Sequence, residues 1–228
     1  MQRQILFLGA PGVGKGTFAR RVAPALSFTH LSAGDILREE VKNKTDIGKS
    51  AESYLSRGSL VSSSLIIELM RQKVALAAAH GVILDGFPRQ REQAEVWATK
   101  PDLVVNIKLN QDVLLTKLTS RRVCPSCGEN YNLADINFPP YDMPALLPKV
   151  PDVCDVCGSS PLVQRDDDKP DVVRHRLALH AELEEPLIGF YRDAGVHVVD
   201  FTVLRGVKQT QELIDLVKTC LKTSRVSG

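Results

Sequence analysis

Residues Gly9–Thr17, with the sequence GAPGVGKGT, have the composition of a loop that binds phosphate groups. Glycines let backbone N–H groups converge on an anion without an obstructing Cβ atom, and a helix that begins after the loop adds positive potential. Lys15 can reach the outer phosphates, and Thr17 can reach a phosphate or Mg²⁺. The usual motif has Ser or Thr directly after the lysine, whereas Gly16 intervenes here.

A short apolar run precedes this loop and a helical pattern follows it, which is the context that the phosphate-binding motif requires. The alternative is a tight turn with a solvent-facing lysine, and it leaves that order unexplained. We therefore predict a nucleoside triphosphate site. Its residues are Gly12, Val13, Gly14, Lys15, Gly16 and Thr17.

Four of the five cysteines form two Cys-x-x-Cys-Gly knuckles. Each knuckle presents two thiolates from a tight turn, and two knuckles make a tetrahedral set that suits structural Zn²⁺. The predicted ligands are Cys124, Cys127, Cys154 and Cys157. Free thiols or disulfides are the alternatives, and a catalytic metal is disfavoured because four thiolates leave no open coordination position. The fifth, Cys220, is expected to be a half-buried small residue of the last helix.

Apolar runs and helical periods alternate along the chain, and they must position these groups. Buried strands are predicted at residues 5–8, 28–31, 82–84, 103–107 and 196–200. Helices are predicted after Lys15 and at residues 35–43 and 62–80. This order predicts an α/β fold, a doubly wound parallel sheet with helices on both faces. Residues 124–161, rich in proline and cysteine and without a helical period, are expected to form an inserted subdomain.

The composition is that of an ordinary globular chain of 228 residues, with 43% hydrophobic residues and a net charge of +2. A net charge so close to zero argues against binding of nucleic acid by general electrostatic attraction. The longest apolar stretch, residues 74–84, is interrupted by His80 and is far shorter than the ~20 residues that span a bilayer. Too few residues precede the first strand for a removable presequence, so we expect a cytoplasmic protein, with a mitochondrial location as the alternative.

Five motifs occur in the order found in one known family. They are the glycine loop and then Ser32–Arg38, Asp85–Arg89, Arg121–Arg122 and Arg165–Asp168. In this respect the sequence resembles the nucleoside monophosphate kinases, most closely the long adenylate kinases with a zinc-binding lid. The resemblance covers nearly the whole chain. It implies reversible phosphoryl transfer from Mg-ATP to AMP, giving two ADP, with Mg²⁺ and structural Zn²⁺ as cofactors.

Phosphoryl transfer needs in-line positioning and fixed positive charge, and it needs little covalent chemistry from the protein. The resemblance gives these catalytic roles to Lys15, Arg89, Arg121, Arg165, Arg176, Asp85 and Asp167. Asp85 matches the carboxylate that orients Mg²⁺ through its waters, and Asp167 and Asp168 match acidic residues that orient the arginines. No serine, cysteine or histidine nucleophile is implied, and the five histidines are expected to be structural.

The same resemblance assigns the two nucleotides to separate sets of residues. The AMP set is Ala33, Arg38, Ser59, Leu60, Val61, Ile66, Gly86, Arg89, Gln93, Arg165 and Arg176. The ATP set, besides the glycine loop, is Lys117, Arg121, Asn130, Tyr131 and the backbone at Lys208. Besides nucleotides we expect no partner: no nucleic acid, no membrane and no second subunit. The protein is therefore expected to be a monomer.

Two residues depart from the pattern of the adenylate kinases. Ala33 replaces the usual Thr or Ser and resembles the uridylate/cytidylate kinases, whereas Gln93 matches the glutamine that faces adenine. We weight Gln93 more heavily and expect AMP as the acceptor, with some tolerance for UMP or CMP. Lys117 replaces an arginine that stacks on the donor base, which leaves a GTP:AMP phosphotransferase as a variant.

A rival interpretation from another class is a P-loop regulator whose zinc ribbon binds nucleic acid. It leaves Arg38, Arg89 and Gln93 unexplained, and no basic, aromatic stripe flanks the knuckles. The spacer between the knuckles, residues 128–153, is longer than in the zinc-bearing lids of the resembling family. The expected domains are a core (1–31, 62–119 and 169–228), an AMP-binding insert (32–61) and a lid (120–168).

Overall fold

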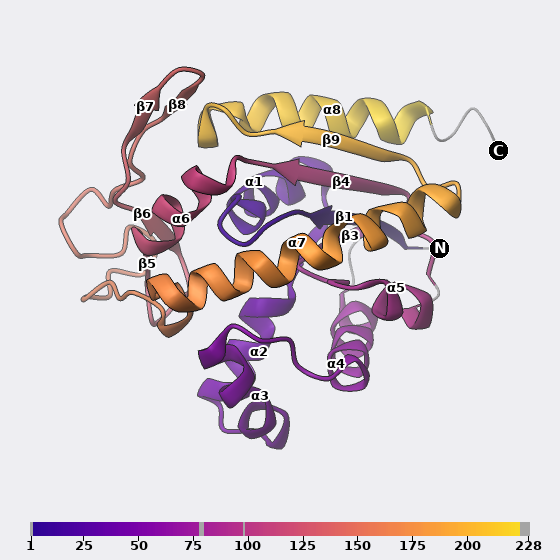
Figure 1. Cartoon of the computed structure of the whole chain (residues 1–228), viewed down its shortest axis with the longest axis horizontal. Helices are drawn as coiled ribbons and strands as arrows, with labels where there is room; N and C mark the ends of the chain where they lie inside the picture. Colours follow the sequence, from indigo (N-terminus) through magenta and orange to yellow (C-terminus); the bar gives the residue numbers. More distant parts are fainter. Residues whose placement is uncertain (1, 78–79, 98, 224–228) are drawn as a thin grey trace.

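A computed structural model describes residues 2–77, 80–97 and 99–223. Its centre is a parallel five-stranded sheet in the order β2-β3-β1-β4-β9 (Figure 1). The strands are β1 (Arg3–Leu8), β2 (Thr29–Ser32), β3 (Gly81–Asp85), β4 (Leu103–Lys108) and β9 (Val198–Thr202). The predicted fold class, a mixed α/β fold with a central parallel sheet, is confirmed.

Alternate residues of β1 face opposite sides of the sheet, and each side has its own apolar core. Ile5 and Phe7 pack with α1 (Lys15–Leu26) and α8 (Thr210–Thr223). Leu6 and Leu8 pack with helices on the other face. Those helices are α4 (Ser63–Leu76), α5 (Arg91–Trp97) and α7 (Pro170–Asp193). Continuous apolar strands such as Val82–Leu84 are buried because helices cover both faces.

The expected elements are all present, with shifted ends. The helix expected at 35–43 begins earlier, as α2 (Ala33–Lys42), because the Ser32 side chain accepts a hydrogen bond from Asp35 N and caps the helix. The helix expected at 62–80 ends at Leu76, which is 79% exposed; residues 78–79 lie outside the described part of the chain. Cys220 is 5% exposed, so it is buried, and the expectation of a half-buried residue was wrong.

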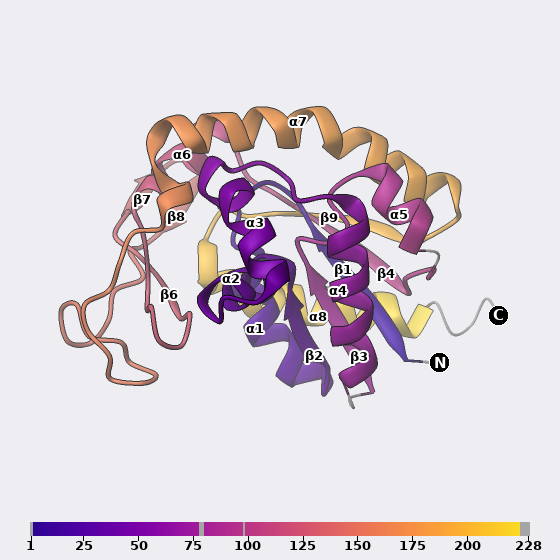
Figure 2. The ribbon, with the colours of Figure 1, turned by 90° about the horizontal axis from the view of Figure 1, so that it is seen from below.

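Two segments extend from the ends of the sheet strands. Residues after β2 form α2 and α3 (Asp46–Arg57), and α6 (Gln111–Thr119) leads into the second segment. That segment holds β5 (Arg121–Val123), β6 (Asn130–Asn132), β7 (Ile136–Phe138), β8 (Tyr141–Met143) and η1 (Asp166–Asp168). Figure 2 shows β6–β8 at one end of the molecule, with α2 and α3 beside this segment and α7 spanning both. Within the described residues, no helix has the length and apolarity needed to cross a membrane.

Candidate active site

The glycine loop joins the carboxyl end of β1 to the start of α1. Gly9, Gly12 and Gly14 all have positive φ angles, of 126°, 84° and 103°. A Cβ atom at Gly9 would lie 2.1 Å from the carbonyl oxygen of Ile107, so this position requires glycine. No side chain caps α1 at Gly14, which leaves the first N–H groups of the helix to face the loop. This is the geometry of an anion site at a helix N-terminus.

Lys15 bends back onto its own loop. Its Nζ atom donates hydrogen bonds to the carbonyl oxygens of Gly9 and Ala10, at 2.7 and 2.8 Å. The protein packed around the half-buried amine lowers the pKa of Lys15 to about 8, and the charges of Arg89 and Arg176 contribute, while Asp85 opposes them. Lys15 is therefore mostly charged at neutral pH and held at the wall of a cavity.

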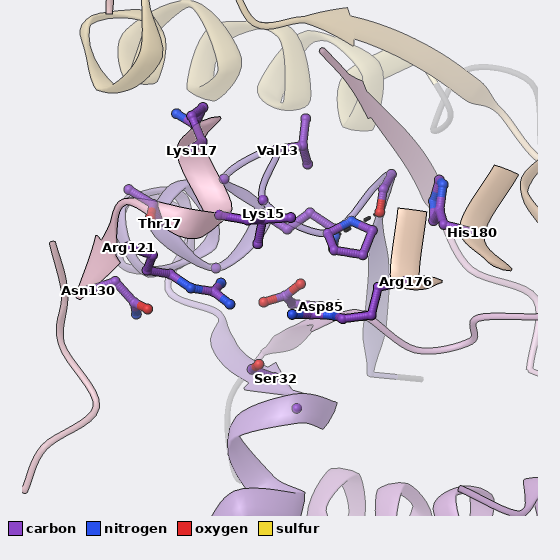
Figure 3. A pocket seen from close by; sticks show the side chains of 18 of the residues that line it. Val13, Lys15, Thr17, Ser32, Asp85, Lys117, Arg121, Asn130, Arg176 and His180 are labelled. Carbon is purple, nitrogen blue, oxygen red and sulfur yellow. Dashed lines mark hydrogen bonds between the residues drawn. The ribbon is translucent and has the colours of Figure 1, made fainter. Parts of the chain in front are cut away.

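The cavity has a volume of about 240 Å³ and lies at the carboxyl ends of the parallel strands. All six cationic residues predicted to act on phosphates line it: Lys15, Arg38, Arg89, Arg121, Arg165 and Arg176. Figure 3 shows Arg121 and Arg176 pointing from opposite sides toward the space beside Asp85. So many cations around one cavity favour a strongly anionic ligand.

Carboxylates hold these arginines in place. The Arg121 guanidinium donates two hydrogen bonds to Asp168, at 2.8 and 2.6 Å, and the Asp168 side chain is fully buried. Arg176 lies 3.0 Å from Asp167 and 3.3 Å from Asp168. Desolvation, with the charges of Arg38 and Arg121, lowers the pKa of Arg165 to about 9, which still leaves it charged at neutral pH. A bidentate pair with a buried carboxylate fixes the plane of a guanidinium.

Asp35 is a second anchor, and it joins three segments of the chain. Its carboxylate lies 2.5 Å from Arg38, 3.2 Å from Arg20 and 3.3 Å from Arg165. Burial acts to raise the pKa of this carboxyl, but Arg38 and the other two guanidinium groups outweigh it, so the pKa is lowered. Asp35 therefore stays ionised at neutral pH.

Asp85, the last residue of β3, faces the start of α1. A Cβ atom at Gly16 would lie 3.0 Å from its Oδ2 atom, and His30 Nε2 lies 3.4 Å from the same oxygen. Burial acts to raise the pKa of Asp85, but the neighbouring His30 and the charge of Lys15 outweigh it and lower the pKa. An ionised carboxylate beside Thr17 and Lys15 suits a hydrated Mg²⁺ ion carried by a triphosphate.

A smaller cavity opens beside the first and is lined largely by apolar residues. Its walls include Ala33, Ser59, Leu60, Val61, Ile66, Gly86, Arg89 and Gln93. Gln93 is 2% exposed, and its Oε1 atom accepts a hydrogen bond of 2.8 Å from Arg89 N. This bond fixes the orientation of the amide at the wall of the small cavity.

The residues predicted for the ATP base lie around the other end of the large cavity. Lys117, Asn130 and Tyr131 line it, whereas Lys208 does not and its neighbours Gly206 and Val207 do. Burial lowers the pKa of the Lys117 amine. The Tyr131 hydroxyl accepts a hydrogen bond from Asp155 N at 2.7 Å, so its polar end is directed into the cysteine-bearing segment.

Sequence reasoning missed several residues of the cavity wall. His180, on α7, lies beside Gly9, and desolvation with the charge of Lys15 lowers its pKa to about 4, so it is neutral at pH 7. Ile136, Met143 and Val203 also line the cavity. His180 belongs to a polar stretch of a long helix, and the other three to short strands or turns, so no local motif marked them.

The four cysteines of the two knuckles form one cluster, with every Sγ atom within 4.8 Å of the others. The Sγ atoms of Cys124 and Cys157 are 3.4 Å apart, and those of Cys127 and Cys154 are 3.5 Å apart. A tetrahedral zinc ion with Zn–S bonds of about 2.3 Å needs sulfur atoms about 3.8 Å apart. The four thiols therefore fit Zn²⁺ in both chemistry and spacing.

Comparisons with known proteins point to one family. The family model described as adenylate kinase matches residues 7–196. The chain is 40% identical over 224 residues to an adenylate kinase of Petrotoga mobilis, covering 95% of this chain and 98% of that protein. It is 36% identical over 227 residues to an adenylate kinase of Lachnospira eligens, covering 96% and 98%. It is 35% identical over 228 residues to a GTP:AMP phosphotransferase of Plasmodium falciparum, covering 98% and 99%.

Proposed function

Because the chain belongs to the adenylate kinase family, we propose that this nucleoside monophosphate kinase transfers the outer phosphoryl group of Mg-ATP to AMP, reversibly, giving two ADP. The observation that carries the proposal is the convergence of Lys15 and five arginines on one cavity at the carboxyl ends of the strands. Two phosphate chains that meet end to end concentrate negative charge, and only such a set of fixed cations can offset it.

The proposed roles follow from the position of each group. Backbone N–H groups of the glycine loop bind the donor phosphates, and Lys15 turns from its loop carbonyls to the outer phosphate oxygens. Arg38 and Arg89 bind the phosphate of AMP, while Arg121, Arg165 and Arg176 surround the transferred group. Asp167 and Asp168 keep those guanidinium groups oriented, so less reorganisation is needed during transfer.

Mg²⁺ fits beside Asp85 and Thr17, where it would neutralise phosphate charge. The acceptor is a phosphate oxygen of AMP that is already ionised, so no protein base has to remove a proton from it. His180, neutral and beside Gly9, has no part in proton transfer in this proposal. Water must be excluded from the cavity, since the same phosphoryl group could otherwise be hydrolysed.

The proposed division of the chain assigns 32–61 to an insert that closes on AMP and 120–168 to a lid that closes on the donor. Two contacts between these segments support it: Arg165 with Asp35, and the Lys42 amine with the Pro125 carbonyl oxygen at 3.3 Å. Zn²⁺ in the Cys₄ cluster is proposed to brace the lid and to take no part in the chemistry, because four thiolates leave no open position. We propose that the protein works as a monomer on nucleotides alone.

GTP as the donor is the second candidate. It is favoured by the identity to a GTP:AMP phosphotransferase and by Lys117, whose ammonium lacks the planar face that stacks on adenine. Purified protein with Mg²⁺, AMP and either ATP or GTP distinguishes the two candidates by the initial rate of phosphoryl transfer, counted as two ADP per transfer from ATP and as one ADP with one GDP per transfer from GTP. We expect ATP to give the higher rate with AMP, and AMP to exceed UMP and CMP as acceptor. No ADP from either donor would refute the proposal.

A further inference from the structure

The β7–β8 hairpin leaves the cysteine-bearing segment and packs on the core. Figure 1 shows the hairpin beside the turn that joins β9 to α8. That turn contains η2 (Gly206–Gln209), and it is shaped by Gln209, whose Oε1 atom accepts hydrogen bonds from Leu204 N and Arg205 N at 2.7 and 2.8 Å. The hairpin therefore rests on a turn that is itself firmly held.

Asp142, in β8, attaches the hairpin to this turn at two points. Its backbone N–H donates to the Leu204 carbonyl oxygen at 2.9 Å. Its carboxylate accepts hydrogen bonds from the Lys208 amine at 2.8 Å on both oxygens. The side chains are about half exposed, at 47% for Lys208 and 52% for Asp142, so the pair acts mainly by orienting the hairpin.

Apolar contacts continue the attachment. Ile136 and Met143 are 4% and 2% exposed and belong to the same core as Phe201 and Val203. Gly206 has a φ of 54°, and a Cβ atom there would lie 3.3 Å from Met143 Cγ. The hairpin is thus part of the core on this side, although its sequence lies within the predicted lid.

Several of these residues also line the large cavity. Its wall includes Lys117, Leu118, Ile136, Met143, Pro144, Val203 and Val207, and Figure 3 shows Lys117 on the side of the cavity away from Ser32. The glycine loop lines the same cavity, so with the donor phosphates bound there as proposed, a planar group attached to them can reach this surface. Mostly apolar walls with few polar groups are typical of a nucleobase subsite.

We propose that the β7–β8 hairpin is a fixed wall of the donor-base subsite, with Asp142 as its positioning residue and Met143 as a residue that contacts the base and sets its selectivity. This inference rests on the proposed function, because it assumes that a nucleoside triphosphate occupies the glycine loop. The contacts of Asp142 with Leu204 and Lys208 hold this wall on the core. Changes in the wall therefore affect the donor and leave AMP binding untouched.

The experiment measures KM and kcat for ATP, for GTP and for AMP with the full chain. Met143→Ala is expected to raise the KM for the donor about tenfold or more and to change the ratio of ATP to GTP use, since it removes three heavy atoms from an apolar wall, where even one methylene group is worth about tenfold. Met143→Leu, with a similar volume, retains the wild-type KM. Asp142→Asn is expected to raise the donor KM about threefold at unchanged kcat, as an exposed ion pair allows.

Asp135→Ala, an exposed residue just before the hairpin, is the matched control and leaves all constants unchanged. The charge-swapped double variant Asp142→Lys with Lys208→Asp is expected to restore the donor KM. Melting temperatures show whether each variant is folded. A donor KM that stays at the wild-type value in Met143→Ala, or a KM for AMP that rises by the same factor, would overturn the inference.

Failure of the proposed function is seen separately, as an inactive wild-type protein. In that case, calorimetric titration with the non-hydrolysable analogue AMPPNP still tests whether the hairpin contributes to binding of the donor base. Weaker binding of the analogue by Met143→Ala than by Asp135→Ala supports the inference, and equal binding by the two variants refutes it.

Discussion

Lys15 couples nucleotide binding to pH. Its pKa of about 8 lies below the ordinary value of 10.5, so between these values the unfolded chain binds more protons than the folded one. The contribution of Lys15 to folding stability therefore rises with pH across this window. The affinity for a triphosphate depends on pH in the opposite direction and falls as pH rises, because phosphate favours the charged amine.

We expect the affinity for ATP to fall as pH rises from 7 to 9, since Lys15 loses its charge over this range. Well above the pKa, the charged fraction falls about tenfold with each pH unit. Calorimetric titration with ATP across this range measures the effect, and titration with AMP gives the comparison. An ATP affinity that is flat from pH 7 to 9, or that rises, would show that Lys15 keeps its ordinary pKa.

Gln93 has two tasks, since it accepts from Arg89 N and lines the small cavity. Gln93→Leu leaves that N–H without its acceptor, at a cost of about 1–3 kcal/mol, and removes the amide from the acceptor subsite. We expect the KM for AMP to rise about tenfold or more, a change of about 1.4 kcal/mol or above, while the KM for ATP stays constant. Steady-state kinetics with each substrate varied in turn test this; an unchanged KM for AMP contradicts the acceptor assignment.

Single residues were predictable from the sequence where they belong to a contiguous motif. The glycine loop, Asp85 and the arginines could be named in advance, and they do line one cavity, although their roles stay predictions. His180 and Met143 could not be named, because they reach the cavity through the packing of α7 and of the hairpin. Lys208 lies in the turn whose residues Gly206 and Val207 line the cavity, but its own side chain is directed to Asp142.

At the scale of elements, the strands were predictable because short apolar runs such as Ile5–Leu8 and Val82–Leu84 are buried by helices on both faces. Strands β5–β8 have three residues each, too short for any period to be recognised. Their pairing depends on the cysteine cluster and on contacts with the core, which are remote in sequence. The sequence pattern therefore indicated that a subdomain is inserted here, but it did not predict the strands inside that subdomain.

The knuckles should depend on metal for their structure. Among the described residues, the apolar cluster of this segment has three buried side chains, Cys124, Tyr131 and Cys154, with Leu162 packed against it, so little apolar burial supports it. We expect removal of zinc by a chelator to lower the melting temperature by several degrees, since metal binding contributes folding free energy. Differential scanning calorimetry before and after stripping tests this, with metal content verified. A melting curve that stays the same after stripping contradicts a structural zinc site.

At the scale of the whole molecule, Arg20 of the glycine-loop helix joins the two segments that flank the cavity. Its guanidinium donates to Glu129 at 2.9 Å and to the Gly128 carbonyl oxygen at 3.0 Å, and it lies 3.2 Å from Asp35. Glu129 follows the first knuckle, whereas Asp35 lies in the first turn of α2. Under the proposed division of the chain, closure on the donor side and closure on the AMP side would share this one residue of the core.

We expect Arg20→Ala to raise the KM for ATP and for AMP together, by about twofold to fivefold, as half-exposed ion pairs allow. Arg21→Ala, an exposed neighbour whose guanidinium donates to Thr17 O, is the control with little effect. High salt should reduce the difference between Arg20→Ala and the wild type, since it screens the pairs. A rise in the KM of one substrate alone would show that the two segments close independently.

The hydrogen bonds of Lys15 to Gly9 and Ala10 have a consequence for dead-end complexes. A triphosphate brings anionic oxygens that replace the two carbonyl groups, so the amine is never left without partners. A monophosphate whose base occupies the donor end is too short to offer that replacement, and it leaves the lysine bound to its own loop. Under the proposed function, we therefore expect the loop to favour long ligands over short ones, and AMP to compete poorly for the donor end.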